Sequence, residues 1–347
     1  MKQLYVISLI FICCFGLAAC AQDKKENDRQ NPDQLLKTAD DCFAKRDTDN
    51  AIKLYQKLLG TKFSRDLIYY KLAKCYVALG SDQKEKNWIL ANYNIDCAIE
   101  ISGKDDFFDL KLELFTIFKK AQEGKDYCSF VSKSSPYPSN IIYKCLVKKL
   151  KFIRVGVQLE NLESSLESID RDAKEAIALF PEKITAFQQA ADIYLGLFKV
   201  FSERKVTSML ILQRGWQYIE KAYQLKEFQD FDNFKTYIDY CQIFYKQSLN
   251  PNDIHAFRIL DAADKAIPLF ADLDYFYQVK AEIFVFLGRY LEAIDCLKLA
   301  TGKKDTGLIR SRKNLSVAIT SLEKVVASLK QVEATTLEVK KILDNER

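Results

Sequence analysis

Apolar and polar residues follow a helical spacing along most of the chain. In residues 35–59 and 66–80, apolar side chains recur three and four residues apart, with charged side chains between them. This spacing places the apolar side chains on one face of each helix. Only 11 Gly and 6 Pro occur in the 347 residues, so few positions interrupt the pattern. The sequence therefore predicts an all-α chain of successive amphipathic helices.

A helix–turn–helix unit is clearest at residues 275–300. Ala281 and Ala293 are small residues on two neighbouring predicted helices, where they allow the helices to approach closely. Leu287-Gly288 ends the first helix with a glycine that adopts a left-handed backbone easily. This unit resembles the tetratricopeptide repeat (TPR), a helix–turn–helix of about 34 residues. The resemblance implies a TPR-like helical-repeat fold, an α-α superhelix or solenoid, with a long C-terminal helix after it.

Other units match this repeat less closely. Ala39 and Ala73 are separated by one repeat length, but Arg46 occupies the place of the turn glycine in the first unit. Further first helices are expected around Ala191 and Cys241, at spacings longer than one repeat length. The matching segments are residues 33–102 and 180–300, whereas residues 105–179 are expected to be helical without following the repeat.

These patterns predict six parts of the chain. Residues 132–140 contain two prolines, which rule out a continuous helix there. In order, the parts are a signal peptide (1–19), a flexible tether (20–32), N-terminal TPR-like repeats (33–130), an irregular helical hairpin region (141–179), C-terminal TPR-like repeats (180–300) and a C-terminal helix (301–347).

The C-terminal segment predicts one long helix, because residues 308–343 contain neither Gly nor Pro. Its apolar stripe is as narrow as a coiled-coil seam and consists of Leu315, Ile319, Leu322, Val326, Leu329, Val332, Thr336, Val339 and Leu343. Two interpretations remain open. The helix caps the last repeat, which repeat proteins need for solubility, or its stripe binds a second copy or another partner.

The N-terminal segment, residues 1–20, has the layout of an export signal. Lys2 precedes an apolar run that ends at Leu17, and the small residues Ala18 and Ala19 come before Cys20. Leu17-Ala18-Ala19-Cys20 resembles the lipobox of bacterial lipoproteins. The resemblance implies cleavage before Cys20 and a covalent diacylglycerol and N-acyl lipid (palmitate) on this residue, which would anchor the chain to a bacterial membrane. Whether the chain faces the periplasm or the outside stays open.

Two alternatives to lipidation exist, a membrane-spanning anchor and plain secretion. A membrane-spanning anchor needs about 20 apolar residues, and this run is shorter and is followed at once by the polar segment 21–32. Plain secretion would leave Cys20 unmodified. The lipobox pattern favours the lipid anchor over both.

Catalytic and metal-binding patterns are lacking in the sequence. The single histidine, His255, has no recognisable Ser, Cys or acidic partner, and no glycine loop or Cys/His cluster suits phosphate or metal. We therefore predict no catalytic residues, no metal and no enzyme activity. The formal net charge of +5 is too small to indicate nucleic acid. Seven cysteines follow Cys20 without a disulfide framework, although Cys128 and Cys145 flank the proline loop and could form a bridge.

Five basic side chains occur in residues 144–154. One interpretation is contact with acidic lipid headgroups or an acidic partner. The other, which we favour, is a solvated helix face whose charges are balanced elsewhere in the fold.

The TPR resemblance also implies which residues face a partner. Side chains from the first helix of each repeat line a groove in this family, and such grooves commonly bind extended or helical peptides. The corresponding residues here are Asp40, Tyr70, Lys74, Val77, Gln188, Asp192, Gln278, Glu282 and Phe286. They mix acids, bases and amides, so they imply no single ligand charge.

The sequence thus predicts a membrane-anchored, non-catalytic scaffold that binds other envelope proteins or peptides. One alternative is an accessory lipoprotein of a solute transporter that holds a small hydrophobic ligand, which the 23 Phe and 18 Tyr keep open. A cell-envelope assembly factor is a further possibility. A glycan-acting enzyme would need two carboxylates about 5–10 Å apart, and no motif predicts such a pair.

Overall fold

The structure is a computed structural model that describes residues 31–79, 84–133, 137–155, 157–158, 160–203, 205–248, 253–309 and 312–345. Within these residues the chain forms 15 α-helices and no strand, which confirms the all-α prediction. The predicted signal peptide and Cys20 lie outside the described residues.

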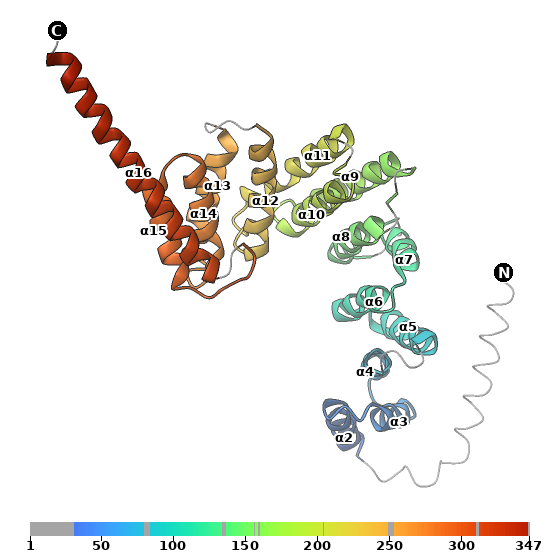
Figure 1. The fold of residues 1–347 in the computed structure, drawn as a ribbon. Helices are drawn as coiled ribbons and strands as arrows, with labels where there is room; N and C mark the ends of the chain where they lie inside the picture. The colour runs from blue at the N-terminus through green and yellow to red at the C-terminus, as the bar shows by residue number, and fades with distance from the viewer. Residues whose placement is uncertain are drawn as a thin grey trace. The chain divides into compact units, whose positions relative to one another are not determined.

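The helices follow one another with short connections (Figure 1). Their bounds are α2 Pro32–Ala44, α3 Thr48–Leu59, α4 Arg65–Ala78, α5 Lys84–Ser102, α6 Asp105–Ile117, α7 Ala121–Lys133, α8 Ser139–Val155, α9 Leu162–Leu179, α10 Ile184–Val200, α11 Lys205–Tyr223, α12 Phe231–Ser248, α13 Ile254–Ala266, α14 Tyr275–Phe286, α15 Tyr290–Thr301 and α16 Arg312–Asn345. Contacts divide the chain into two compact units, Met1–Cys145 (unit 1) and Leu146–Arg347 (unit 2), with the boundary inside α8.

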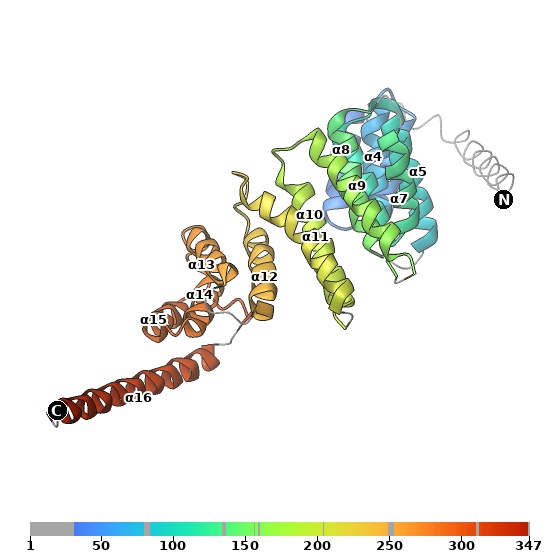
Figure 2. The ribbon, with the colours of Figure 1, turned by 90° about the horizontal axis from the view of Figure 1, so that it is seen from above.

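Consecutive helices pack in pairs. In unit 1 the pairs are α2–α3, α4–α5 and α6–α7, and in unit 2 they are α10–α11, α12–α13 and α14–α15. Figure 2 shows α4 beside α5 and α10 beside α11. This succession of hairpins is the helical-repeat architecture that the sequence predicts.

Small residues sit where paired helices meet. Ala281 of α14 is 1% exposed and Ala293 of α15 is 0% exposed, and both belong to the same core cluster. Ala39 and Ala51 are likewise fully buried between α2 and α3. A methyl group at these positions allows close helix packing at the density of a protein interior, so the role predicted for these alanines is confirmed.

Three hairpins share one turn geometry. The residue after the first helix's C-cap is left-handed in each: Arg46 (φ +64°), Lys119 (φ +58°) and Gly288 (φ +72°). This is the Schellman arrangement, which satisfies carbonyl groups at a helix end. In each case the next amide donates to the carbonyl five residues earlier: Asp47 to Cys42 (2.9 Å), Lys120 to Phe115 (2.8 Å) and Arg289 to Phe284 (2.8 Å).

The α6–α7 hairpin corrects one expectation, because residues 105–179 were predicted to depart from the repeat throughout. Leu112 and Gly124 are both buried, and they have the same separation along the chain as Ala39 and Ala51. A large residue on the first helix and a glycine on the second therefore occupy the places that the two alanines hold in the α2–α3 hairpin. A larger residue on one helix is offset by a smaller one on the other, so the total side-chain volume stays similar. A search for a small residue on both helices therefore misses this repeat.

The connection between α15 and α16 is fixed by a buried carboxylate. Asp274 is 1% exposed, and its Oδ1 accepts hydrogen bonds from the amide (2.9 Å) and hydroxyl (2.7 Å) of Thr306. Lys304 donates its amide to the carbonyl of Asp272 (2.7 Å) beside this contact. These bonds hold the last connection against the start of α14.

The beginning of α16 covers the last hairpin. Leu315 is 0% exposed in the core cluster of α14 and α15, and Ile319 and Leu322 pack against that cluster. This part of α16 confirms the capping interpretation for the first turns of the helix.

All cysteines in the described part of the chain are free thiols. Cys128 and Cys145 are both 0% exposed, and the bridge that the sequence allowed between them is not formed. Burial raises the pKa of the Cys75 thiol to about 12, which fits the role of a small hydrophobic residue.

No helix among the described residues has both the length and the apolar character required to cross a lipid bilayer.

Candidate partner-binding faces

His255 lies in the first turn of α13 and has an acidic partner. Its Nδ1 is 2.8 Å from Oδ1 of Asp253, and the same oxygen accepts a hydrogen bond from the His255 amide at 2.7 Å. Burial favours the neutral acid, but hydrogen bonds from Ser248 and His255 hold the pKa of Asp253 below its usual value. Asp253 is therefore the N-cap of α13, and the expectation of a histidine without an acidic neighbour is wrong.

Across the described residues, no group of three His, Cys, Asp or Glu side chains is placed to hold a metal ion.

The predicted groove residues Tyr70 and Lys74 meet at the junction of α4 and α6 in unit 1. The Tyr70 ring centroid lies 4.9 Å from that of Phe107, and Lys74 Nζ lies 5.5 Å from the Tyr70 centroid. Lys74 is exposed and Tyr70 is partly exposed. Burial, together with Asp106 and other nearby acids, raises the pKa of Tyr70. The phenol is therefore uncharged at neutral pH and presents a ring and a hydroxyl group.

An acidic stripe runs along α6 next to Tyr70. Asp106, Asp109 and Glu113 are exposed and are spaced by three and four residues, so they share one face of the helix. After burial, the negative charges of all three add to the rise in the pKa of Tyr70. Sequence reasoning did not select these acids, because α6 was not recognised as the first helix of a repeat.

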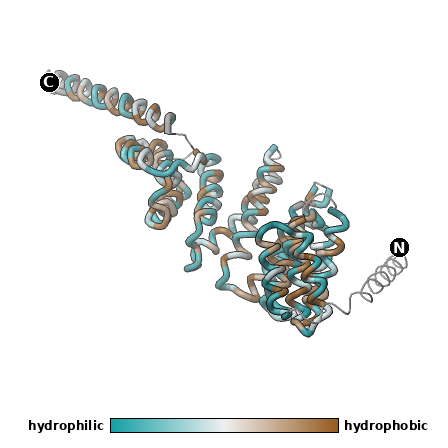
Figure 3. The backbone as a smooth tube through the Cα atoms, turned by 90° about the horizontal axis from the view of Figure 1, so that it is seen from below, coloured by the Kyte–Doolittle hydropathy of each residue, from teal (hydrophilic) through white to brown (hydrophobic). Residues whose placement is uncertain are grey.

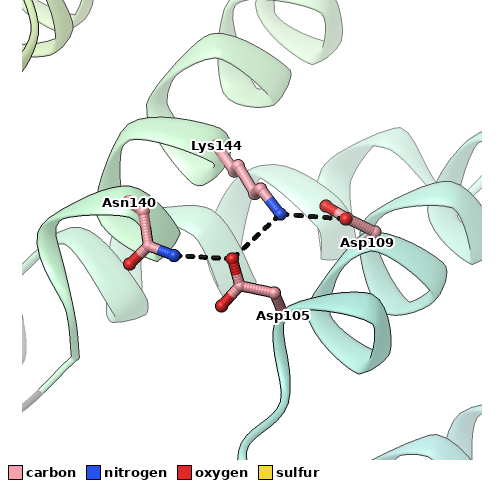
Figure 4. Close-up of polar contacts among 4 residues, drawn as sticks. All are labelled: Asp105, Asp109, Asn140 and Lys144. Atoms are coloured by element: carbon pink, nitrogen blue, oxygen red, sulfur yellow. Dashed lines mark hydrogen bonds and ion pairs between the residues drawn. The ribbon is translucent and has the colours of Figure 1, made fainter.

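Lys144 of α8 reaches the carboxylates of Asp105 and Asp109 on α6 (Figure 4). Its Nζ is 2.9 Å from Oδ2 of Asp109 and 3.4 Å from Oδ2 of Asp105, which also accepts a hydrogen bond from Asn140 at 2.6 Å. Burial disfavours the ammonium, but the two carboxylates hold the pKa of Lys144 above its usual value. We call Tyr70, Lys74, Asp106, Asp109, Glu113 and Lys144 the unit 1 face.

Two other predicted residues in unit 1 are engaged within the chain. Asp40 Oδ1 accepts from Lys71 Nζ at 2.7 Å and from the hydroxyl of Tyr55, so it links α2, α3 and α4. Val77 packs against the core of unit 1. Both are partly exposed, but their main contacts are internal.

Gln188 and Asp192 come together in unit 2. Gln188 Nε2 donates to Asp192 Oδ1 at 3.0 Å, and Thr236 of α12 donates its hydroxyl to the same oxygen at 2.9 Å. Burial raises the pKa of Asp192, although these two hydrogen bonds oppose the shift. A carboxyl group with a raised pKa beside a second polar side chain is a candidate recognition point.

Gln278 is not accessible, contrary to prediction. It is 1% exposed, and its Nε2 donates to Asp274 Oδ2 at 2.8 Å. Nearby, Phe286 packs edge-on to Tyr245, with centroids 4.3 Å apart. Burial, reinforced by the Glu282 charge, raises the pKa of Tyr245 to about 12. Glu282 and Phe286 are partly exposed. Of the three groove residues predicted on α14, these two are therefore accessible and Gln278 is not.

Two of the five basic side chains of residues 144–154 are ion-paired within their own units. Lys144 pairs with the α6 carboxylates described above, and the buried Lys149 lies 3.0 Å from Oδ2 of Asp172. These pairs support the interpretation that the basic charges are balanced by the fold.

No family model matches this chain, and a comparison with curated proteins finds no relative. Among solved structures, it is similar to the assembly chaperone of RpL4 (Acl4), with 12% identity over 77% of this chain and 100% of the other, at a TM-score of 0.32. It is also similar to yeast Tom70, with 13% identity over 78% and 75% and a TM-score of 0.26. The TPR2AB domain of yeast Sti1 in complex with an HSP90 peptide gives 12% identity over 74% and 96%, with a TM-score of 0.26.

Proposed function

We propose that this chain is a non-catalytic protein-binding scaffold, held on a bacterial membrane through lipid on Cys20. The observation that carries the binding role is the unit 1 face. There, the partly exposed Tyr70 ring packs against Phe107 of α6 and lies beside the exposed Lys74, and α6 carries exposed acids next to Phe107.

This surface suits a peptide or protein segment. An aromatic side chain supplies contact area at a low cost in conformational entropy, while acids and lysines around it give orientation and register. Lys74 carries an exposed positive charge and Asp106 and Glu113 carry exposed negative charges, so the face offers both charges to one ligand. A partner with alternating basic and acidic side chains fits this pattern best.

The anchor is supported by the order of residues around Leu17-Ala18-Ala19-Cys20. A lipid at this point would concentrate the binding surface close to the envelope proteins it serves. Acyl chains add about 0.8 kcal/mol per buried methylene group, and more than one chain gives durable attachment.

The packing of the aromatic residues favours the scaffold over the transport accessory. In unit 2, Tyr223 stacks on Tyr237 with centroids 4.1 Å apart, and Phe228 packs edge-on to Phe234 at 5.0 Å. These rings fill the core between helices. Packing in the unit 2 core therefore accounts for these four aromatic side chains.

The binding role is tested by affinity purification of the full chain from its native envelope. The double variant Tyr70→Ala/Lys74→Ala should lose a partner that the unaltered chain retains. Lys57→Ala, an exposed lysine of α3 away from the unit 1 face, should retain it. Recovery of the same proteins with all three chains would contradict a role for this face.

The anchor is tested separately, by metabolic labelling with a palmitate analogue. Label should enter the unaltered chain and be absent from Cys20→Ser, which should leave the membrane fraction. An unmodified Cys20 thiol in the purified protein would refute the anchor without bearing on the binding face.

A further inference from the structure

The junction between α10 and α12 in unit 2 is polar, unlike most contacts between the helices. Teal polar and brown apolar positions alternate along the helices (Figure 3), and the side chains buried between neighbouring helices of unit 2 are mostly apolar. Here, in contrast, Gln188 and Asp192 of α10 meet Thr236 of α12, which is 8% exposed. Both Gln188 and Thr236 donate to Oδ1 of Asp192, and no donor of the described residues reaches its Oδ2. One oxygen of this carboxylate is therefore available.

Gln188 adds a second available acceptor. Its Nε2 donates to Asp192, whereas its Oε1 is buried and has no hydrogen-bond partner in the part of the chain that the structure describes. A buried acceptor without a donor destabilises a fold, and native structures contain few of them. This oxygen therefore indicates a donor that another molecule supplies.

Asn233 of α12 brings a third polar group to the junction. Its side chain is 5% exposed and forms no hydrogen bond with any described residue. Asn233 precedes Thr236 by about one helical turn and Tyr240 by about two. Both of those residues bond to α10, and the Tyr240 hydroxyl donates to the carbonyl of Ala191 at 2.7 Å. Asn233 therefore lies on the side of α12 that faces α10. Alternate helices in a series of hairpins run in the same direction, which places Asn233 at the level of Gln188.

The charges around this junction favour a cation. Burial raises the pKa of Asp192 against its two hydrogen bonds, and the neighbouring Asp232 charge adds to the rise. Lys151 of α8 opposes the rise, but its side chain is exposed and its effect is smaller than that of either hydrogen bond. A positive group bound beside Asp192 would offset the electrostatic cost of burying the carboxylate.

We propose that Gln188, Asp192 and Asn233 form a binding site for the ammonium group of a lysine side chain on a protein partner. An ammonium has three N–H donors, one for each of Asp192 Oδ2, Gln188 Oε1 and Asn233 Oδ1. The guanidinium of arginine is a planar fork suited to two oxygens of one carboxylate, whereas the ammonium is compact. A Ca²⁺ ion takes about six to eight oxygen ligands, more than this junction offers. The site rests on the proposed protein-binding function but not on the unit 1 face.

The test uses the full chain, with the blocked lysine Nα-acetyl-lysine methylamide as the probe. Ligand-observed NMR is the readout, because a single side chain binds weakly. Magnetisation should transfer from the protein to this probe, but not to Nα-acetyl-norleucine methylamide, which has the same stem without the ammonium. Asp192→Asn should weaken binding of the blocked lysine about ten-fold, because a charge-assisted hydrogen bond becomes a neutral one. Gln188→Met should weaken it several-fold, and the exposed Asp295→Asn of α15 should leave it unchanged. Lys151→Met should strengthen it, because a like charge near the site is removed.

Asp192→Asn should keep the fold, because it removes a charge that burial disfavours, and its unfolding is measured in parallel. No transfer to the blocked lysine, equal transfer to both probes, or unchanged binding in Asp192→Asn would each overturn the proposal. Displacement of the blocked lysine by Mg²⁺ or Ca²⁺ at equal ionic strength, but not by Na⁺, would overturn it in favour of a metal site. None of these outcomes bears on the unit 1 face, which is tested by partner recovery with Tyr70→Ala/Lys74→Ala.

Discussion

Lys104 Nζ lies 2.8 Å from Oδ2 of Asp66, so the residue that follows the α4–α5 hairpin is ion-paired with the first turn of α4. Ser102 donates to the same oxygen at 2.8 Å, and Asp66 is only 5% exposed. The hydrogen bond from Lys104, followed by that from Ser64, holds the pKa of Asp66 well below its ordinary value. One buried carboxylate thus links the start of α4 to the end of α5 and to the residue that precedes α6.

Asp66→Asn should lower the free energy of unfolding at neutral pH by about 1–3 kcal/mol, because it leaves buried donors without a charged acceptor. Since the folded pKa lies below the unfolded value of 3.8, the carboxylate stabilises the fold above that value and loses its effect as the pH falls through the folded pKa. The difference between variant and unaltered chain should therefore shrink in acid. Urea titrations from pH 7 downward measure it, with the exposed Asp41→Asn as the control; a pH-independent difference would refute the role of the charge.

Arg46 has a left-handed backbone conformation, so its replacement by glycine should stabilise the fold. Arg46→Gly removes backbone strain of about 1–2 kcal/mol and adds unfolded-state freedom worth about 0.4–1 kcal/mol, so the variant should gain roughly 0.5–1 kcal/mol. Lys45→Gly, at a neighbouring residue with φ −80°, gains no such relief and should be destabilised. Thermal unfolding compares the two, and equal effects would show that the turn at Arg46 is misassigned.

Replacement of Gly215 of α11 by alanine should be strongly destabilising. A Cβ atom there would lie 1.9 Å from the Tyr240 hydroxyl and 2.6 Å from Tyr194 Cβ, in a buried contact between helices. Gly215→Ala should therefore cost about 2–3 kcal/mol through overpacking, and Tyr240→Phe in the same chain should recover part of the loss. At Gly196 the three atoms nearest to an added Cβ belong to the guanidinium end of the flexible Arg154 side chain, which can move aside, so Gly196→Ala should be neutral or stabilising. Equal tolerance of both alanines by denaturant titration would contradict this packing.

The contribution of Asp192 to the free energy of unfolding should have the opposite pH dependence to that of Asp66. Burial raises its pKa, so the folded chain holds this proton more tightly than the unfolded chain, and stability falls as the pH rises from the unfolded value through the folded one. Asp192→Asn keeps an oxygen that accepts from Gln188 and Thr236 but carries no charge. The variant should be more stable than the unaltered chain at neutral pH, and the gain should vanish in acid. Asp295→Asn, at an exposed position of α15, serves as the control; an Asp192→Asn variant that is less stable than the unaltered chain at pH 7 would rule out the burial penalty.

Sequence patterns predicted the hairpins wherever a small residue and a turn signal occur together. Around Ala281 both are present, with Gly288 as the turn residue, and the predicted close contact is found. In α6–α7 both signals are altered, because Leu112 replaces the alanine and Lys119 adopts the left-handed turn. The regular spacing of Leu112, Gly124 and Cys128 was the remaining signal.

The candidate surface was predictable only in part, because exposure depends on partners distant in sequence. Tyr70 and Lys74 follow from the register of one repeat, but the acids beside them come from α6, whose register was not recognised. Gln278 has the position of a groove residue, yet the neighbouring Asp274, held by Thr306 from the connection after α15, draws it into the interior. No local pattern around Gln278 encodes that contact.

The central claim is that first-helix side chains of the repeats bind a protein partner, and photocrosslinking in living cells tests it most directly. A photoreactive residue replaces Lys74 on the unit 1 face or, as the matched control, Lys57 on α3; both lysines are exposed. We expect position 74 to yield a discrete crosslinked envelope protein that position 57 does not. Crosslinking of the same protein from both positions, or none from position 74, would contradict the account.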